Sequence, residues 1–519
     1  MTRKSSFWRQ WKWPLFWGLG IILVFFLLRL FHLTILPIFA DEAIYIRWSQ
    51  VMRAEPTLRF LPLSDGKQPL FMWLTIPFLK IFSDSLFAGR FLSVLAGFGS
   101  LIGLFFVSWS LFKNKWVSLL SCFLYSLVPF FVFFDRLALV DSMLMMFGIW
   151  LAFLFLWLVR SVRLDLSLIS GLVLAGALIT KSPAVFFALL FPSGLLLGKK
   201  LKKKILPLLG FWFLILVLGF GIYNFLLRLG PGFQMIAIRN RDYLFTFKEI
   251  LSHPLDPLKP HLGDLASWLP NLLTWPVLLL VLVGLGLGLK TKLRATLFLL
   301  LWFLVPLSAQ MVFAKVFTPR YILFTIWPLI LFAAFGFHWL FNQLNRWKKL
   351  KKKIVFSLGG LLLLLIVLPS LRYDGLLLTN PERAPLPRNL RNGHLEEWTA
   401  GQGLKESAEF LKEKAKSGSV FVGTEGFFGS LPDGLQIYLE GIPNIKVIGV
   451  GWPVVEVSQS LINSLVDNDV YLLVNQSRLK LNPKEKGLIL VEEYPKAIWP
   501  DGFQDKLLLF SLDKDYFQQ

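Results

Sequence analysis

Two adjacent carboxylates, Asp41 and Glu42, follow an apolar stretch that is long enough to cross a membrane. A carboxylate at this place can cap a helix that begins at Ala43, because acidic groups suit the positive end of a helix dipole. A cap explains the presence of one of the two acids well and that of the second poorly. We therefore predict that Asp41 is a general base that takes a proton from a hydroxyl group, and that Glu42 positions substrate or the neighbouring helix.

Five cations stand at the ends of apolar stretches, where they can approach the same face of a membrane: Lys67, Arg90, Arg136, Lys181 and Arg320. Each of them can also be a cation that reaches from a span end toward water, or part of a plain turn. Together they suit an anionic, phosphorylated substrate at the membrane interface. Two further acids, Asp135 and Asp141, can pair with Arg136, and Asp141 lies deep enough to need a partner.

No spacing in the sequence predicts a metal site. The histidines are scattered, and the one cysteine, Cys122, lies inside an apolar stretch. A divalent ion shared by Asp41, Glu42 and Asp141 is left open, although no spacing requires it. The residues identify no other cofactor.

The composition identifies the elements that must hold these side chains. The chain has 519 residues, of which 55% are hydrophobic and only 17% charged, which is typical of a polytopic α-helical membrane protein. The net charge of +22 can suggest nucleic acid, but the basic residues form short clusters between apolar stretches, as in cytoplasmic loops. We therefore expect membrane lipids, and no nucleic acid, as partners.

We predict about eleven transmembrane helices from apolar stretches near the ~20 residues that a span requires. They are 14–33, 87–111, 116–134, 137–158, 166–180, 184–198, 205–227, 271–289, 295–313, 321–342 and 354–370. With a cytoplasmic N-terminus, the inner segments hold 22 Lys and Arg residues and one acid, Asp165, in accord with the positive-inside rule. Helices 166–180 and 184–198 are short and can instead form a re-entrant pair.

This topology divides the chain into two domains. Residues 1–370 form the transmembrane domain, with an uncleaved first helix and an external loop, 34–86, that contains an interfacial helix near 69–82. Residues 371–519 alternate helix and strand patterns and form a soluble α/β domain on the outer side. The simple N-terminus favours a prokaryotic plasma (inner) membrane.

The ordered motifs resemble the GT-C membrane glycosyltransferases, in the branch of the protein O-mannosyltransferases and lipid A aminoarabinose transferases. The resemblance covers most of residues 14–342 and rests on ADEAIY, GKQPLFMW, AGRFLSVLAG, LALVDSML, ITKSPA and PRYILFTIWP. Two positions depart from the family pattern. Gln68 replaces the first of two paired prolines, and Ser182 replaces a glycine.

The resemblance implies transfer of a sugar from a polyprenyl-phosphate carrier to an acceptor hydroxyl on the outer face, by an inverting single displacement. The acceptor is a glycan, a lipid or a protein. Asp41 is the implied base, and the implied substrate-binding residues are Glu42, Tyr45, Lys67, Arg90, Arg136, Asp141, Lys181, Arg320 and Tyr321. The cations among them hold the phosphate and stabilise the charge that grows as it leaves.

Three other functions fit a membrane protein of this composition. An oligosaccharyltransferase-like enzyme is disfavoured because the outer domain has no WWD-type motif. A lipid or sugar transporter or flippase favours polar groups at the bilayer midplane, whereas those of this chain stand at the outer ends of spans. A purely structural assembly protein would tolerate substitution of Asp41.

Overall fold

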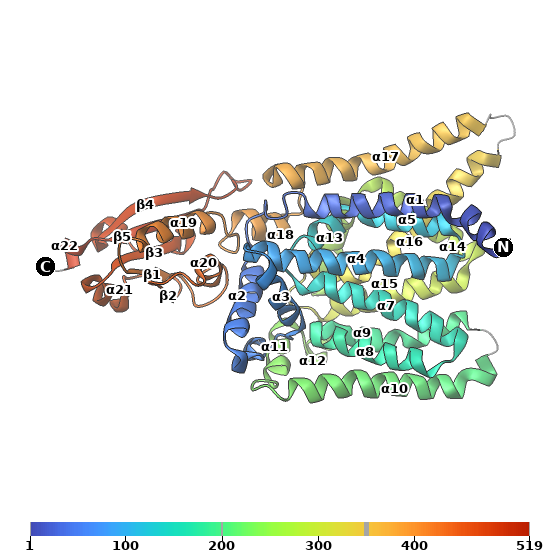
Figure 1. The fold of residues 1–519 in the computed structure, drawn as a ribbon, viewed down its shortest axis with the longest axis horizontal. Helices are drawn as coiled ribbons and strands as arrows, with labels where there is room; N and C mark the ends of the chain where they lie inside the picture. The colour runs from blue at the N-terminus through green and yellow to red at the C-terminus, as the bar shows by residue number, and fades with distance from the viewer. Residues whose placement is uncertain (1, 199–200, 347–351, 518–519) are drawn as a thin grey trace. The chain divides into compact units, whose positions relative to one another are not determined.

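The computed structural model describes residues 2–198, 201–346 and 352–517. The chain forms two compact units, and each is built from separate segments (Figure 1). The helical unit comprises Met1–His32, Thr57–Leu74 and Arg90–Pro387. The sheet unit comprises Leu33–Pro56, Thr75–Gly89 and Arg388–Gln519.

Seven helices in the described residues are long and apolar enough to cross a membrane. They are α1 (Thr2–Leu30, apolar from Gln10), α4 (Ser85–Phe112), α7 (Val140–Ser161), α10 (Leu201–Leu227), α15 (Leu293–Phe313), α16 (Pro319–Arg346) and α17 (Lys352–Thr379). The protein is therefore a multi-pass membrane protein. Helix α17 continues past residue 370, where the sequence places the domain boundary.

Two further pairs of apolar helices in the described residues are bent, and each is a broken span or a re-entrant loop. Helix α5 (Lys115–Leu127) meets α6 (Pro129–Asp135) at 62°, and α13 (Leu258–Leu273) meets α14 (Trp275–Thr291) at 105°. Each break has a local cause, because Pro129 cannot continue the hydrogen-bond ladder of α5 and Thr274 has a positive φ of 69°. If each pair is one span, nine candidate spans are described.

The expected spans 166–180 and 184–198 are shorter than the others. Helix α8 (Leu164–Thr180) has 17 residues, or about 26 Å at 1.5 Å per residue. After Lys181 the chain forms a short 3-10 turn, helix α9 (Val185–Leu190) and a second 3-10 segment that ends at Leu197. The elements lie where the sequence predicts them, and the total of eleven crossings stays a prediction.

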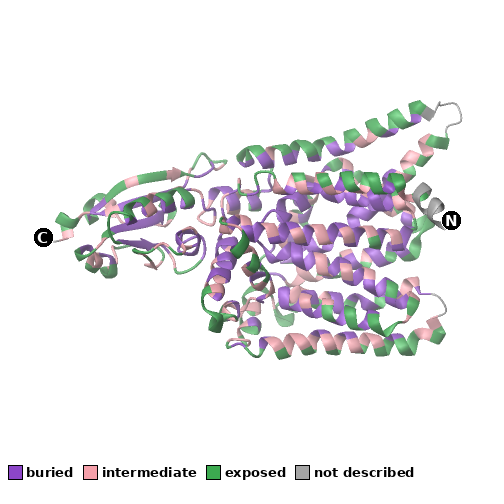
Figure 2. Cartoon of the chain, in the orientation of Figure 1, coloured by how far each residue is buried: buried purple, intermediate pink, exposed green. Residues whose placement is uncertain are grey.

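Helix α16 is at the centre of the helical unit. Of its most apolar window 83% is buried, against 17% for α10 and 28% for α17, and Figure 2 shows the exposed outer faces of those two helices. Helices α14 and α16 touch through their backbones: a Cβ on Gly284 would lie 1.9 Å from the carbonyl oxygen of Phe332. Small residues at such crossings are typical of membrane helix packing.

The sheet unit contains a five-stranded sheet in the order β2-β1-β3-β5-β4 (Figure 1). The strands are β1 (Val420–Thr424), β2 (Ile445–Gly449), β3 (Asp469–Asn475), β4 (Leu488–Pro495) and β5 (Lys506–Leu512). Strand β1 is parallel to β2 and β3, and β5 is antiparallel to β3 and β4. This confirms the α/β class of the C-terminal domain, although the sequence analysis did not identify β5.

The remaining helices are shorter. The sheet unit has α2 (Ala40–Ala54), α18 (Arg388–Arg391), α19 (Leu404–Ala415), α20 (Asp433–Leu439), α21 (Gln459–Asn463) and α22 (Lys514–Phe517). The helical unit has α11 (Met235–Tyr243) and α12 (Phe247–Ser252). Helix α3 (Leu70–Ile81) is the helix expected near 69–82, and its 12 residues are too few to span a bilayer.

Candidate functional site

Helix α2 carries the two acids and Tyr45, and it begins at Ala40, earlier than expected. The carboxylate of Glu42 accepts a hydrogen bond of 3.0 Å from the backbone N–H of Phe39, and Glu42 is fully buried. Glu42 therefore caps its own helix. Asp41 is only half-buried and lies in the first turn, near the positive end of the helix dipole. Tyr45 is buried one turn later.

Four of the predicted residues gather in the helical unit. The ammonium of Lys181, in the turn after α8, lies 2.6 Å from a carboxylate oxygen of Asp141 on α7. The same ammonium lies 4.4 Å from the ring centroid of Tyr321 on α16. The guanidinium of Arg320 lies 4.9 Å from the same ring. Lys181 from the turn after α8 and Arg320 from α16 thus lie at the same tyrosine ring. Helix α7 contributes the acid that pairs with Lys181.

The loop that carries Lys67 contacts the same turn. The ammonium of Lys67 lies 3.5 Å from Asp65, and the amide of Gln68 donates a hydrogen bond of 2.7 Å to the hydroxyl of Ser182. Gln68 and Ser182 are the two positions that depart from the family pattern. Because each supplies the other's partner, the bond ties the loop to the residue next to Lys181.

Arg136 lies in a different environment. It is almost fully buried, and its guanidinium donates bonds of 2.7 to 3.0 Å to the carbonyls at the end of α1, those of Leu28, Arg29, Phe31 and His32. The last carbonyls of a helix have no partner within the helix, so Arg136 closes the end of α1. This geometry favours a structural role. Arg90 is fully buried in α4, close enough to Arg136 for their charges to interact.

The acids near Arg136 pair elsewhere. Asp135 accepts hydrogen bonds from Arg29 at 3.0 Å and from Tyr125 at 2.9 Å, and both members of the Arg29–Asp135 pair are fully buried. The predicted pairing of Asp135 and Asp141 with Arg136 is therefore wrong. The guanidinium of Arg136 donates to backbone carbonyls, whereas Asp135 pairs with Arg29 and Asp141 with Lys181. Arg29 follows a long apolar stretch. The sequence does not indicate that its partner is Asp135, and the structure does.

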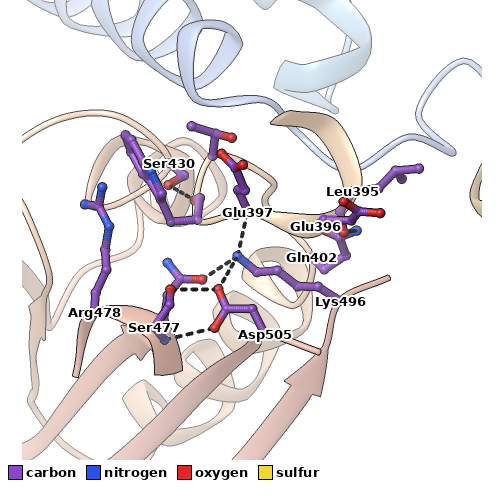
Figure 3. Close-up of polar contacts among 12 residues, drawn as sticks. Leu395, Glu396, Glu397, Gln402, Ser430, Ser477, Arg478, Lys496 and Asp505 are labelled. Carbon is purple, nitrogen blue, oxygen red and sulfur yellow. Dashed lines mark hydrogen bonds and ion pairs between the residues drawn. The ribbon is translucent and has the colours of Figure 1, made fainter. Parts of the chain in front are cut away.

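The sheet unit has a buried polar network that the sequence analysis missed (Figure 3). Lys496 is almost fully buried, and its ammonium donates to the carbonyl of Glu397 at 2.9 Å and to Asn475 at 2.5 Å. Burial lowers the pKa of Lys496 to about 8, although Asp505, at 3.7 Å, opposes that shift. Asp505 also accepts two bonds from Ser477. These groups satisfy one another, so the network fits a structural role.

Another carboxyl of the sheet unit titrates unusually. Asp433, in the first turn of α20, accepts a bond of 2.7 Å from the N–H of Gly429. Burial raises its pKa to about 6, against the opposing effects of that bond and of Arg47. Among the described residues, no group of three or more His, Cys, Asp or Glu side chains is arranged to hold a metal ion.

Comparisons with known proteins agree with this architecture. The family model described as dolichyl-phosphate-mannose-protein mannosyltransferase matches residues 66–223, which include Lys67, Asp141 and Lys181 but not Asp41. A comparison with curated protein sequences finds no match.

Solved structures match over nearly the whole chain. ArnT from Cupriavidus metallidurans in the apo state has a TM-score of 0.58 and 12% identity, over 97% of this chain and 98% of that one. The same protein bound to undecaprenyl phosphate has a TM-score of 0.54 and 13% identity, over 96% and 98%. The Archaeoglobus fulgidus oligosaccharyltransferase AglB, in complex with an inhibitory peptide and a dolichol-phosphate, has a TM-score of 0.55 and 11% identity, over 96% and 74%. At these identities the comparisons show the fold.

Proposed function

We propose, from the GT-C membrane glycosyltransferase fold that this chain has, that the protein transfers a sugar from a polyprenyl-phosphate carrier to an acceptor hydroxyl. The observation that carries the proposal is the gathering of Lys181 and Arg320 at Tyr321, with the Lys67 loop bonded to the same turn. Matching structures with undecaprenyl phosphate and with a dolichol-phosphate support this class of donor.

The cations suit the phosphate of such a donor. The side chain of Lys181 is 21% exposed, whereas that of its partner Asp141 is 4% exposed, so the ammonium can reach a ligand while the acid stays covered. The side chain of Lys67 is 23% exposed. A positive charge held near the phosphate stabilises it as it leaves, and therefore reduces the need for an acid to protonate it.

Asp41 acts on the acceptor. Its carboxylate takes the proton of the acceptor hydroxyl as that oxygen forms a bond to the anomeric carbon of the sugar. On the opposite side the bond from the anomeric carbon to the phosphate oxygen breaks, and polyprenyl phosphate leaves with the electron pair. One displacement inverts the anomeric centre. Glu42 has a different task, because its carboxylate holds the start of the helix.

We place the reaction at the outer face of the plasma (inner) membrane, with the N-terminus in the cytoplasm and the sheet unit outside. The basic clusters in the predicted inner segments support this orientation. The sugar is a hexose or a pentose, and the acceptor is a glycan, a lipid or a protein.

The test is transfer from a panel of radiolabelled polyprenyl-phosphate sugars in membranes that contain the protein and a broad extract of acceptors. We expect the wild type to transfer one sugar and Asp41→Asn to bind that donor without transferring it. Glu409→Gln, on the exposed surface of α19, is the matched loss of a carboxylate and should transfer normally. Equal transfer by Asp41→Asn and the wild type would remove Asp41 from catalysis, and no transfer from any donor would contradict the proposed reaction.

A further inference from the structure

The segment that carries Asp41 is built into the C-terminal half of the chain. At its start the backbone pairs with residues 399–401: the N–H of Ala40 donates to the carbonyl of Thr399 at 3.0 Å, and the N–H of Gly401 donates to that of Ile38 at 2.9 Å. The ring of Phe39 lies 4.4 Å from that of His394. Ala40, the residue before Asp41, is therefore held by residues that lie about 360 positions later in the sequence.

The other end of α2 is held by α20. Arg53 forms an ion pair of 2.7 Å with Glu440. The guanidinium of Arg47 donates to the side chain of Gln436 at 3.1 Å, and Gln50 donates to the carbonyl of Ile437 at 3.1 Å. Positions 47, 50 and 53 share one face of the helix, since residues three apart are neighbours on a helix surface.

Helix α2 needs these contacts to keep its place. It has 15 residues, and an isolated helix of this length is only marginally stable in water. A general base must lie within hydrogen-bond distance of the proton that it removes. An error of about 1 Å in the place of a reacting group can lower a rate by as much as about 100-fold.

We propose that helix α20 and residues 399–401 position the catalytic carboxylate, so that Arg53, Glu440 and Gly401 are positioning residues for the transfer reaction. This inference rests on the proposed function, in which Asp41 is the base. It assigns the sheet unit a part in the chemical step, because that unit fixes the place of the base within its own structure.

The first test reverses the charges of the ion pair in the full-length protein. Arg53→Glu and Glu440→Arg should each lower kcat about tenfold and leave the KM for the lipid-linked donor unchanged. The double variant Arg53→Glu/Glu440→Arg restores an opposite-charge pair, although not the bond of 2.7 Å that Arg53 donates to the carbonyl of Leu79, and should have a higher kcat than either single variant. Single variants with wild-type kcat, or a double variant no better than either single one, would overturn the proposal.

A second readout does not use activity. Hydrogen exchange of the backbone amides of residues 40–54 should be faster in each single variant than in the wild type, and slower in the double variant than in either single variant. Unchanged exchange would show that α20 does not hold α2. If Asp41→Asn keeps its activity while exchange behaves as expected, the proposed base is wrong and the mechanical link is right, so the two failures are distinguishable.

The third test addresses the other anchor. A Cβ on Gly401 would lie 2.7 Å from the carbonyl oxygen of Ile38, so Gly401→Ala should displace the start of α2 and lower kcat without raising the KM for the donor. Gly418→Ala is the matched control in the same unit, because nothing lies within 4 Å of its added carbon. Equal kcat in both variants would contradict the role of residues 399–401.

Discussion

Asp41 and Glu42 are chemically similar neighbours with different surroundings. Glu42 is fully buried and bonded to the backbone of Phe39, whereas Asp41 is half-buried at the same helix start. Two adjacent positions on a helix point about 100° apart, so one side chain can serve the helix while the other serves a substrate. The capping interpretation therefore applies to Glu42, and the proposed catalytic role belongs to Asp41 alone.

Removal of the Glu42 carboxylate should cost stability before it costs chemistry. Glu42→Ala leaves the N–H of Phe39 without its acceptor, and we expect a loss of about 1 kcal/mol in the free energy of unfolding. Glu42→Gln keeps an acceptor oxygen and should melt close to the wild type. The melting temperature of the purified protein measures this, and equal melting of Glu42→Ala and the wild type would exclude the cap.

The Lys181–Asp141 pair combines stability with ligand binding. Lys181→Met leaves the covered acid without its cation, which typically costs about 3–5 kcal/mol. The double variant Lys181→Met/Asp141→Leu removes both charges and should recover most of the melting temperature. It should still bind polyprenyl phosphate more weakly than the wild type, because the phosphate has lost its cation.

The measurements are thermal melting in detergent and the Kd for polyprenyl phosphate. Wild-type affinity in the double variant would mean that Lys181 serves Asp141 alone. Lys290→Met, an exposed lysine at the end of α14, is the matched loss of a membrane-flanking cation and should change neither quantity.

The sequence identified residues of the candidate site better than it identified their partners. Asp141, Lys181 and Tyr321 could be found because charged or aromatic groups that open or close an apolar stretch stand out. The pairing of Asp135 with Arg29 could not, since the two residues are 106 positions apart and many cations compete for each acid. The bond between Gln68 and Ser182 explains two departures that the sequence alone could only note.

At the scale of elements, the sequence predicts where the long helices lie, but not how they bend. Apolar stretches predict where spans lie because a bilayer sets their length. The bends of 62° and 105° depend on how neighbouring helices pack against the two halves of each pair. The sequence of one apolar stretch does not contain that information. The strand β5 was missed because its run of leucines follows no alternation.

The crossing of α14 and α16 depends on Gly284. An added methyl would overlap the backbone of Phe332, so Gly284→Ala should force the helices apart at a cost of about 1–3 kcal/mol. Gly286→Ala, two residues along the same helix, has nothing within 4 Å of its added carbon and should melt at or slightly above the wild-type temperature. Equal melting temperatures of the two variants would contradict the close crossing.

At the scale of the whole molecule, the chain segments that make up the sheet unit constrain the number of membrane crossings. Residues 33–56 and 75–89 share one compact unit with residues 388–519, so all three segments lie on one side of the membrane. The chain between them must therefore cross an even number of times. Of the nine candidate spans, eight follow α1, and counting both short elements after Arg163 would make ten.

The orientation can be measured with single cysteines. Cys122 is buried, so it should not react with a membrane-impermeant maleimide. Lys248→Cys lies in an exposed segment that we place outside, and Lys292→Cys lies in an exposed turn that we place in the cytoplasm. In intact cells we expect only Lys248→Cys to be labelled, and labelling of Lys292→Cys alone would reverse the topology.

The sequence predicts an α/β domain at the end of the chain, but it does not show that residues 33–56 of the first loop share a compact unit with it. The side chains of Arg47 and Gln436 bond across 389 positions. No local pattern marks such a contact, because each partner also reads as an ordinary exposed polar residue.

This separation along the chain has a consequence for synthesis. Helix α2 leaves the ribosome early, and α20 follows it by 389 positions, a delay of roughly 20 to 80 s at about 5–20 residues per second. During that time the membrane helices can insert while the acid-bearing helix still lacks its support. We expect a chain released before residue 388 to insert without the proposed transfer activity, because α2 would lack its contacts with residues 399–401 and with α20.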